Sequence, residues 1–174
     1  MNCGFKDSQP IMHVIIYTLR GLLECELIED NMVKDMGLME VVIKTVNKLC
    51  EVANQQFVHG IKGMMPRAFN EKWEGLMTDS CLTGNAQFVI LLYRISHVVK
   101  DNLLYLKTAN LILSSLKKTQ LIDTDLKDIR GALPGTFPIY RGYLHDAYPN
   151  WGTKFFADAL LMKIEYEQRL VISA

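Results

Sequence analysis

The stretch IKGMMPRAF, residues 61–69, returns 68 residues later in the sequence as IRGALPGTF, residues 129–137. Both copies follow the pattern I-[KR]-G-x-[ML]-P-x-x-F. The same offset aligns three later pairs without a gap: Gly84 with Gly152, Phe88 with Phe156, and Leu92 with Leu160. This register indicates an internal repeat between residues 61–92 and residues 129–160, in which a loop and the apolar segment after it form one unit.

Five segments have the hydrophobic periodicity of helices, and their character alternates along the chain. Three are apolar on nearly every face and are expected to be buried, at residues 11–26, 83–99 and 151–170. Two are amphipathic, at residues 31–56 and 102–119. Between them lie two long loops, 57–82 and 120–150, and loops of that length are usually functional. The sequence therefore predicts an all-α fold, an array of αα-hairpins with buried inner helices and more solvent-exposed outer helices.

The predicted array is one domain of 174 residues that begins and ends on an inner helix without an outer partner. We therefore expect apolar surface at both ends of the array. A second copy of the chain, or the missing N-terminal half of a larger ring, would cover it. The alternative is a free-standing five-helix bundle.

Composition and charge exclude several classes of function. Lys plus Arg and Asp plus Glu both number 19, so the large positive field that nucleic-acid or anionic-membrane binding needs is absent. The four cysteines form no CxxC pair and have no histidine at metal-ligand spacing, so neither a zinc site nor a disulfide framework is predicted. Charged residues interrupt the apolar stretches before they reach the length of a membrane span, and no signal peptide is recognisable. We expect a cytoplasmic protein.

Motifs of several enzyme classes are absent from the sequence. It has no GxxxxGK[ST] phosphate loop, no GxGxxG, no HExxH and no GxSxG elbow, so nucleotide, zinc-peptidase and α/β-hydrolase chemistries have no support. The DxDD and aspartate-rich motifs of cyclases and prenyl synthases are missing too. No cofactor is expected. Glycosidase chemistry needs two opposed carboxylates, for which Asp79, Asp146 and Asp158 are the candidates.

Residues 140–151 gather three tyrosines, a tryptophan, a histidine and an aspartate in one loop. Aromatic faces stack on the apolar C–H surfaces of sugar rings, while Asp, Asn and Arg bond to hydroxyls. The same rings can instead surround a carbocation or an isoprenoid chain, or clamp a long loop onto the helices. The residues predicted to bind a substrate are Asn85, Gln87, Arg130, Tyr140, Tyr143, His145, Tyr148, Asn150, Trp151 and Lys154.

His13 and Tyr17 share one face at the start of the first inner helix, at spacing i, i+4. An imidazole and a phenol in this position can serve as acid and base, whereas a hydrogen-bonded core histidine is the alternative. The predicted catalytic set is His13, Tyr17, Asp146 and Asp158. Lys154 and Asp158, again at i, i+4, equally fit an ion pair.

The start of the second inner helix carries a further group of polar residues. Asp79 or Ser80 is expected to cap this helix. Asn85 and Gln87 are harder to explain as core residues, because an amide inside an apolar helix needs a polar partner.

Three strings of the sequence resemble a known class of proteins: PIMHVIIYTLRGLLE (10–24), SCLTGNAQFVILLYRI (80–95) and GALPGTFPIYRGYLHDAYPNWGTKFFADALLM (131–162). They are similar to the C-terminal half of uncharacterised microbial proteins of the α/α-toroid class. These proteins are distantly similar to terpenoid cyclases, protein prenyltransferases and six-hairpin glycosidases, and are often found with polysaccharide-biosynthesis genes. The resemblance implies a partial toroid, in which inner helices line a funnel and the loops that lead into them form its mouth.

Together these observations predict a toroid protein that binds or modifies a carbohydrate. The predicted site consists of the aromatic loop and the starts of the inner helices. For an enzyme, the prediction is glycoside hydrolase, lyase or epimerase-like chemistry, and binding is favoured over turnover. The alternative is a non-catalytic helical scaffold or interaction domain, and a terpenoid cyclase-like or prenyltransferase-like enzyme is disfavoured.

Overall fold

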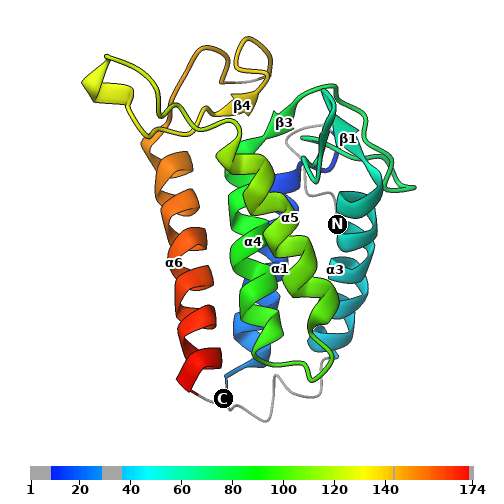
Figure 1. Ribbon diagram of the computed structural model, residues 1–174. Coiled ribbons are helices and arrows are strands. Elements are labelled where there is room, and N and C mark those ends of the chain that lie inside the picture. Colours follow the sequence, from blue (N-terminus) through cyan, green and yellow to red (C-terminus); the bar gives the residue numbers. More distant parts are fainter. Residues whose placement is uncertain (1–8, 29–36, 143, 173–174) are drawn as a thin grey trace.

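A computed structural model describes residues 9–28, 37–142 and 144–172 of the chain. These residues form five α-helices: α1 (Met12–Glu26), α3 (Leu38–Gln55), α4 (Leu82–Ser96), α5 (Leu103–Lys117) and α6 (Asn150–Ile172) (Figure 1). Two small two-stranded sheets accompany the helices. The predicted all-α class is confirmed, apart from these short strands.

The observed helices begin and end within a few residues of the predicted segments. The largest difference in the described part is at the end of α4, which stops at Ser96 where the apolar pattern predicts Val99. The amides of His97 and Val98 bond to carbonyls three residues earlier, so the helix closes in a tighter turn. α3 begins after Gly37, and the predicted helical residues 31–36 lie outside the described part of the chain.

The central helix is α4, which packs against α1, α5 and α6 (Figure 1). Every residue of α4 except Arg94 is buried, as predicted for an inner helix. α3 packs against α1 and α5, so α1, α4 and α6 form one layer and α3 and α5 form a second. The amphipathic pattern of α3 explains its place, because Val42, Val46 and Leu49 are buried while Lys44 is exposed.

The prediction that the last helix is buried is wrong for α6. One narrow face packs against α4 and places Phe156 and Ala159 in the core. Its other faces expose large apolar side chains: Trp151, Leu161, Ile164, Leu170 and Val171. α6 has helix neighbours on one side within the described residues, and apolar composition alone does not bury a helix.

Two short antiparallel sheets lie in the segments predicted as loops, at the end of the molecule where α1, α4 and α6 begin (Figure 1). β1 (Phe57–Val58) and β2 (Ile61–Lys62) form a hairpin. β3 (Ser80–Cys81) precedes α4 and pairs with β4 (Thr136–Phe137) of the second loop, which also contains a 3-10 turn (Lys127–Ile129). The β3–β4 pairing holds the two loops together. We call this end of the molecule the loop end.

Equivalent positions of the two sequence copies attach each loop to its helix in the same way. The Met65 amide donates to Asn85 Oδ1 at 3.0 Å, and the Leu133 amide donates to Thr153 Oγ1 at 3.1 Å. Donors and acceptors are both 68 residues apart in the sequence. Each loop is therefore bonded to the first turn of the inner helix that follows it.

Two equivalent glycines, Gly84 and Gly152, allow neighbouring inner helices to approach closely. A Cβ atom on Gly84 would lie 3.1 Å from the backbone nitrogen of His13 in α1. A Cβ atom on Gly152 would lie 3.1 Å from Thr83 Oγ1 in α4. The absence of a side chain at these positions lets the starts of α1, α4 and α6 lie side by side.

Candidate binding site at the loop end

The start of α4 is held by contacts that differ from the predicted ones. Its N-cap residue is Cys81, whose Sγ accepts a hydrogen bond from the Gly84 amide at 3.4 Å. Asp79 forms an ion pair with Arg67, with 2.6 Å between Oδ2 and Nε. Ser80 donates its hydroxyl to a backbone carbonyl of the first loop. The prediction that Asp79 or Ser80 caps this helix is therefore wrong.

Asn85 and Gln87 are both buried in α4, and their surroundings differ. Asn85 Oδ1 accepts from the Met65 amide, and its Nδ2 donates to Ser80 Oγ and to the Cys81 carbonyl. Gln87 is 2% exposed, and neither atom of its amide bonds to any described residue. Asn85 thus joins the first loop to α4, whereas Gln87 carries an unpaired amide in the core.

His13 and Tyr17 lie on successive turns of α1 and meet different partners. Burial, with a smaller contribution from the Arg67 charge, lowers the pKa of His13 and favours the neutral imidazole. Its Nδ1 lies 3.9 Å from Cys81 Sγ. Tyr17 is half exposed, and its ring meets the Phe155 ring of α6 edge-on with 6.1 Å between centroids. The imidazole therefore lies at the start of α4, and the phenol ring contacts α6.

The two predicted catalytic carboxylates, Asp146 and Asp158, each have a basic neighbour. Asp158 pairs with Lys154 one turn earlier on α6, so the ion-pair interpretation of these two residues is correct. Asp146 lies in an exposed loop, with its Oδ2 3.4 Å from Nδ1 of His145. Each carboxylate is thus engaged by a residue close to it in the sequence.

A cavity of about 520 Å³ opens at the loop end, between the end of α5 and the second loop. We call it the Tyr140 cavity. It is lined by His59, Lys118, Thr119, Gln120, Leu121, Pro134, Phe137, Pro138, Ile139, Tyr140 and Tyr148. Tyr140 is 64% exposed, so much of its side chain is open to solvent. Two of the predicted binding residues, Tyr140 and Tyr148, meet in this cavity.

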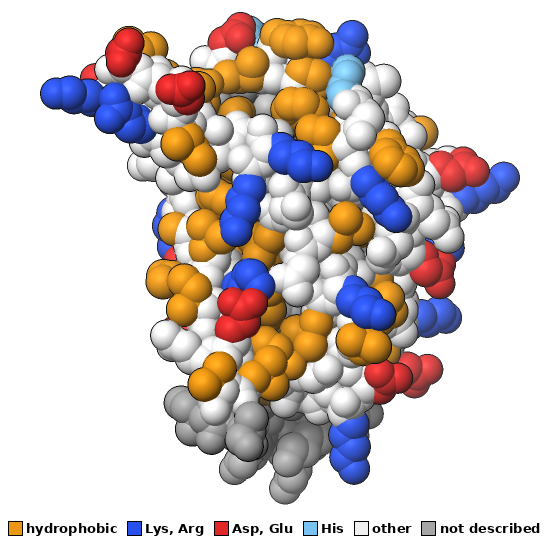
Figure 2. Space-filling view, viewed as in Figure 1, with side chains coloured by type: hydrophobic (Ala, Val, Ile, Leu, Met, Phe, Trp, Pro, Cys, Tyr) orange, Lys and Arg blue, Asp and Glu red, His pale blue; other side chains and the backbone are white. Residues whose placement is uncertain are grey.

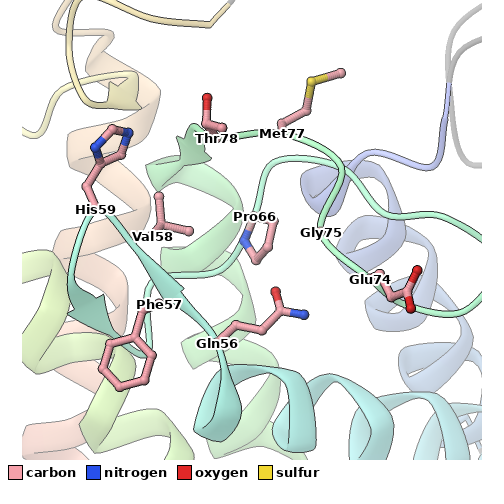
Figure 3. A pocket seen from close by; sticks show the side chains of 9 residues that line it. All are labelled: Gln56, Phe57, Val58, His59, Pro66, Glu74, Gly75, Met77 and Thr78. Carbon is pink, nitrogen blue, oxygen red and sulfur yellow. The ribbon is translucent and has the colours of Figure 1, made fainter.

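A second cavity, of about 510 Å³, shares His59 with the first. We call it the Pro66 cavity. The strand Phe57–Val58 forms one wall, with Gln56 and Pro66 beside it (Figure 3). The other wall consists of Glu74, Gly75, Met77 and Thr78. Pro66 lies close to Gly75, where an added Cβ atom would lie 2.5 Å from Pro66 Cγ.

His59 lines both cavities. It forms the two-residue turn of the β1–β2 hairpin with Gly60, and both residues have positive φ values, +47° and +77°. The imidazole ring meets the Phe137 ring edge-on, with centroids 6.1 Å apart. We refer to the two cavities together as the loop-end site. Hydrophobic side chains gather at this end on the face shown in Figure 2.

The sequence-based prediction misses His59, Phe57 and Lys118 as parts of this site. A signal for the first two is present in the sequence, because His59-Gly60 between the short β-prone segments Phe57–Val58 and Ile61–Lys62 fits a two-residue hairpin turn. No local signal marks Lys118, because its place in the cavity depends on where the second loop folds.

The remaining predicted binding residues that the structure describes line neither cavity. Asn150 and Trp151 are exposed at the start of α6. Arg130 is exposed and donates from Nε to the Thr124 carbonyl at 3.0 Å. Tyr143 lies outside the described residues.

Comparisons with protein-family models, curated proteins and solved structures found no match for this chain. Within the described ranges, no group of three or more His, Cys, Asp or Glu side chains is placed to hold a metal ion. The same residues include no helix with the length and apolar character that a membrane crossing requires.

Proposed function

We propose that this protein binds a carbohydrate at the loop-end site. The observation that carries the proposal is the lining of the Tyr140 cavity, where the rings of Phe137, Tyr140 and Tyr148 surround the same space as Lys118 and Gln120. Aromatic faces match the apolar faces of sugar rings, and amine and amide groups match their hydroxyls. An exposed ring such as Tyr140 can stack on a sugar without any unfolding of the protein.

The presence of His59 in the lining of both cavities supports an oligosaccharide as the ligand. Their volumes of about 520 and 510 Å³ lie within the range of roughly 300–1,000 Å³ typical of ligand pockets. Each cavity therefore has room for a sugar unit, and an oligosaccharide long enough to reach both would extend past His59.

The helix array supports a toroid segment as the setting for this site. The starts of α1, α4 and α6 lie side by side at the loop end, and equivalent hydrogen bonds attach two loops to their inner helices. In a toroid these loops would form the mouth of the funnel, where a polysaccharide enters. Together with the resemblance of the sequence, this favours a role in polysaccharide synthesis or breakdown.

Binding is favoured over turnover for the chain described. A glycosidase needs one carboxylate as a proton donor and an opposed one as nucleophile or base. Asp146 and Asp158 are instead engaged by His145 and Lys154. Should the chain act as an enzyme, hydrolase, lyase or epimerase-like chemistry fits a site of this composition.

One observation favours a second candidate function, that of a non-catalytic helical scaffold. α6 exposes Leu161, Ile164 and Val171 along its length, and contiguous exposed apolar side chains mark interaction surfaces. A scaffold would use this surface and leave the loop-end cavities without a ligand.

A thermal-shift screen with neutral and acidic oligosaccharides tests the proposed function. At 100 times the Kd, a ligand adds about 2.7 kcal/mol to the free energy of unfolding, which corresponds to a rise in Tm of roughly 5–10 °C for a chain of this size. We expect Tyr140→Ala to remove the shift, because that ring lines the cavity. Leu103→Ala is the control, since this exposed side chain lies at the start of α5, away from the loop end. Absence of a shift with every glycan would favour the scaffold.

A further inference from the structure

Among the described residues, one charged side chain lines the Tyr140 cavity, and its charge is positive. Lys118 is the only Lys, Arg, Asp or Glu among the eleven lining residues, and His59 is the only lining residue that can add a second positive charge. A sugar ring carries no charge of its own. A cationic lining without a carboxylate therefore points to a ligand with a negative group.

Lys118 has no carboxylate partner among the described residues. Lys48, Lys154 and Lys163 each form an ion pair with an acidic side chain one turn away. Lys107 and Lys117 have no such pair within the described ranges either, and Lys118 differs from them because it lines the cavity. An exposed, unpaired ammonium group beside aromatic rings is free to meet an anion that docks against those rings.

Backbone hydrogen bonds fix the wall that holds Lys118. The Leu121 amide donates to the Ala132 carbonyl at 3.1 Å, and the Gly131 amide donates to the Leu121 carbonyl at 2.6 Å. Gln120 Nε2 also donates to the Gly131 carbonyl at 2.8 Å. Because these bonds join the start of the second loop, directly after α5, to residues 131–132 of the same loop, the cavity wall is formed before any ligand binds.

We propose that the Tyr140 cavity selects sugar units that carry a carboxylate, so that the ligand is an oligosaccharide containing uronic acid. The sugar ring would stack on the exposed Tyr140 ring, and the carboxylate would accept a hydrogen bond from the Lys118 ammonium. This inference rests on the proposed function and names the class of sugar that the site takes. The Lys118 ammonium also interacts favourably with the partial negative charge at the C-terminal end of α5. Lys117 has the same interaction but does not line the cavity, so it separates the two roles.

Calorimetric titration with matched pairs of tetrasaccharides tests this selectivity. The pairs are oligogalacturonate and oligomannuronate, each beside its carboxyl-reduced, neutral counterpart. We expect at least one acidic member to bind about 10-fold more tightly than its counterpart at low salt, with the difference shrinking as salt screens the charge. Lys118→Gln should remove the difference, and Lys117→Gln, the matched control, should preserve it.

The outcomes separate this inference from the proposed function. Equal binding of acidic and neutral members, unchanged by Lys118→Gln, would overturn the selectivity and leave carbohydrate binding in place. Absence of binding for all four tetrasaccharides would overturn the selectivity for uronic acids, and the broader thermal-shift screen would then decide the proposed function separately. An acidic preference that Lys118→Gln leaves intact would place the anion elsewhere and contradict the role of this cavity.

Discussion

Two buried amides on α4 offer opposite predictions for stability. Gln87→Met removes an amide that has no described partner and keeps a side chain of similar size, so we expect the free energy of unfolding to rise by about 1–3 kcal/mol. Asn85→Leu breaks three hydrogen bonds between α4 and the first loop, and we expect a loss of about 2–4 kcal/mol. Urea denaturation measures both. A loss of stability in Gln87→Met would mean that the amide has a partner, such as an internal water.

The sequence identifies which of these residues need an explanation, but not which partner each one has. An amide within an apolar run signals a buried polar group, and this signal is correct for both Asn85 and Gln87. The expected capping role of Asp79 is wrong because its partner, Arg67, comes from the first loop. Contacts between segments depend on how the chain folds, which helix-start patterns do not encode.

At the scale of the loops, the equivalent glycines Gly63 and Gly131 should respond differently to substitution. Both have left-handed φ values, +85° and +82°, so alanine costs about 1–2 kcal/mol at either position. At Gly63 the new Cβ would also lie 2.6 Å from Leu111 Cγ, whereas at Gly131 the nearest atom is 3.9 Å away. We expect Gly63→Ala to lower the free energy of unfolding by about 3 kcal/mol and Gly131→Ala by about 1 kcal/mol.

The matched control for these loop variants is Gly21→Ala, in the interior of α1. No atom lies within 4 Å of the added Cβ there, so alanine should stabilise the helix by about 0.5–1 kcal/mol. Thermal or urea unfolding of the three variants provides the comparison. Equal losses in Gly63→Ala and Gly131→Ala would show that backbone conformation, and not contact with α5, decides the cost.

Helical periodicity predicts the elements of this chain well, because apolar residues three and four apart define a helix locally. It does not predict the β1–β2 hairpin, whose strands have only two residues each. The turn residues His59 and Gly60 carry the signal for that hairpin. The β3–β4 pair could not be predicted, since it joins segments more than 50 residues apart in the sequence.

At the scale of the whole molecule, the exposed face of α6 predicts self-association. Ala157, Leu161 and Ile164 are exposed, whereas the residues 68 positions earlier on α4, Val89, Tyr93 and Ser96, are buried. On α4, the helix α5 packs near the side that carries Tyr93, and the Tyr93 hydroxyl donates to Asn110 Oδ1 of α5 at 3.4 Å. We therefore expect a second copy to cover the corresponding face of α6.

Sedimentation velocity at micromolar concentration checks this expectation. The unmodified protein should sediment as a dimer or larger species, and Leu161→Glu should shift it to the monomer because a charge would be buried in the interface. Lys117→Gln, on the exposed side of α5, is the control. A monomer at all concentrations would contradict the prediction and indicate that α6 is stable with this face in water.

The burial of whole helices was the least predictable feature of the fold. Composition and periodicity are nearly the same for α4 and the first half of α6, but only α4 has helices on several sides within the described residues. The site could be predicted only in part for the same reason. The aromatic loop is recognisable in the sequence, but its position beside Lys118 and His59 depends on how both loops pack.

The most direct test of carbohydrate binding at the loop end is the change in backbone amide NMR shifts on titration with the glycan that raises Tm most. We expect the largest changes at residues 57–61, 118–121 and 136–142, which form or border the two cavities, and none around Leu103 at the far end of α5. The largest changes along residues 157–171 of α6, with none at the loop end, would contradict the proposed site.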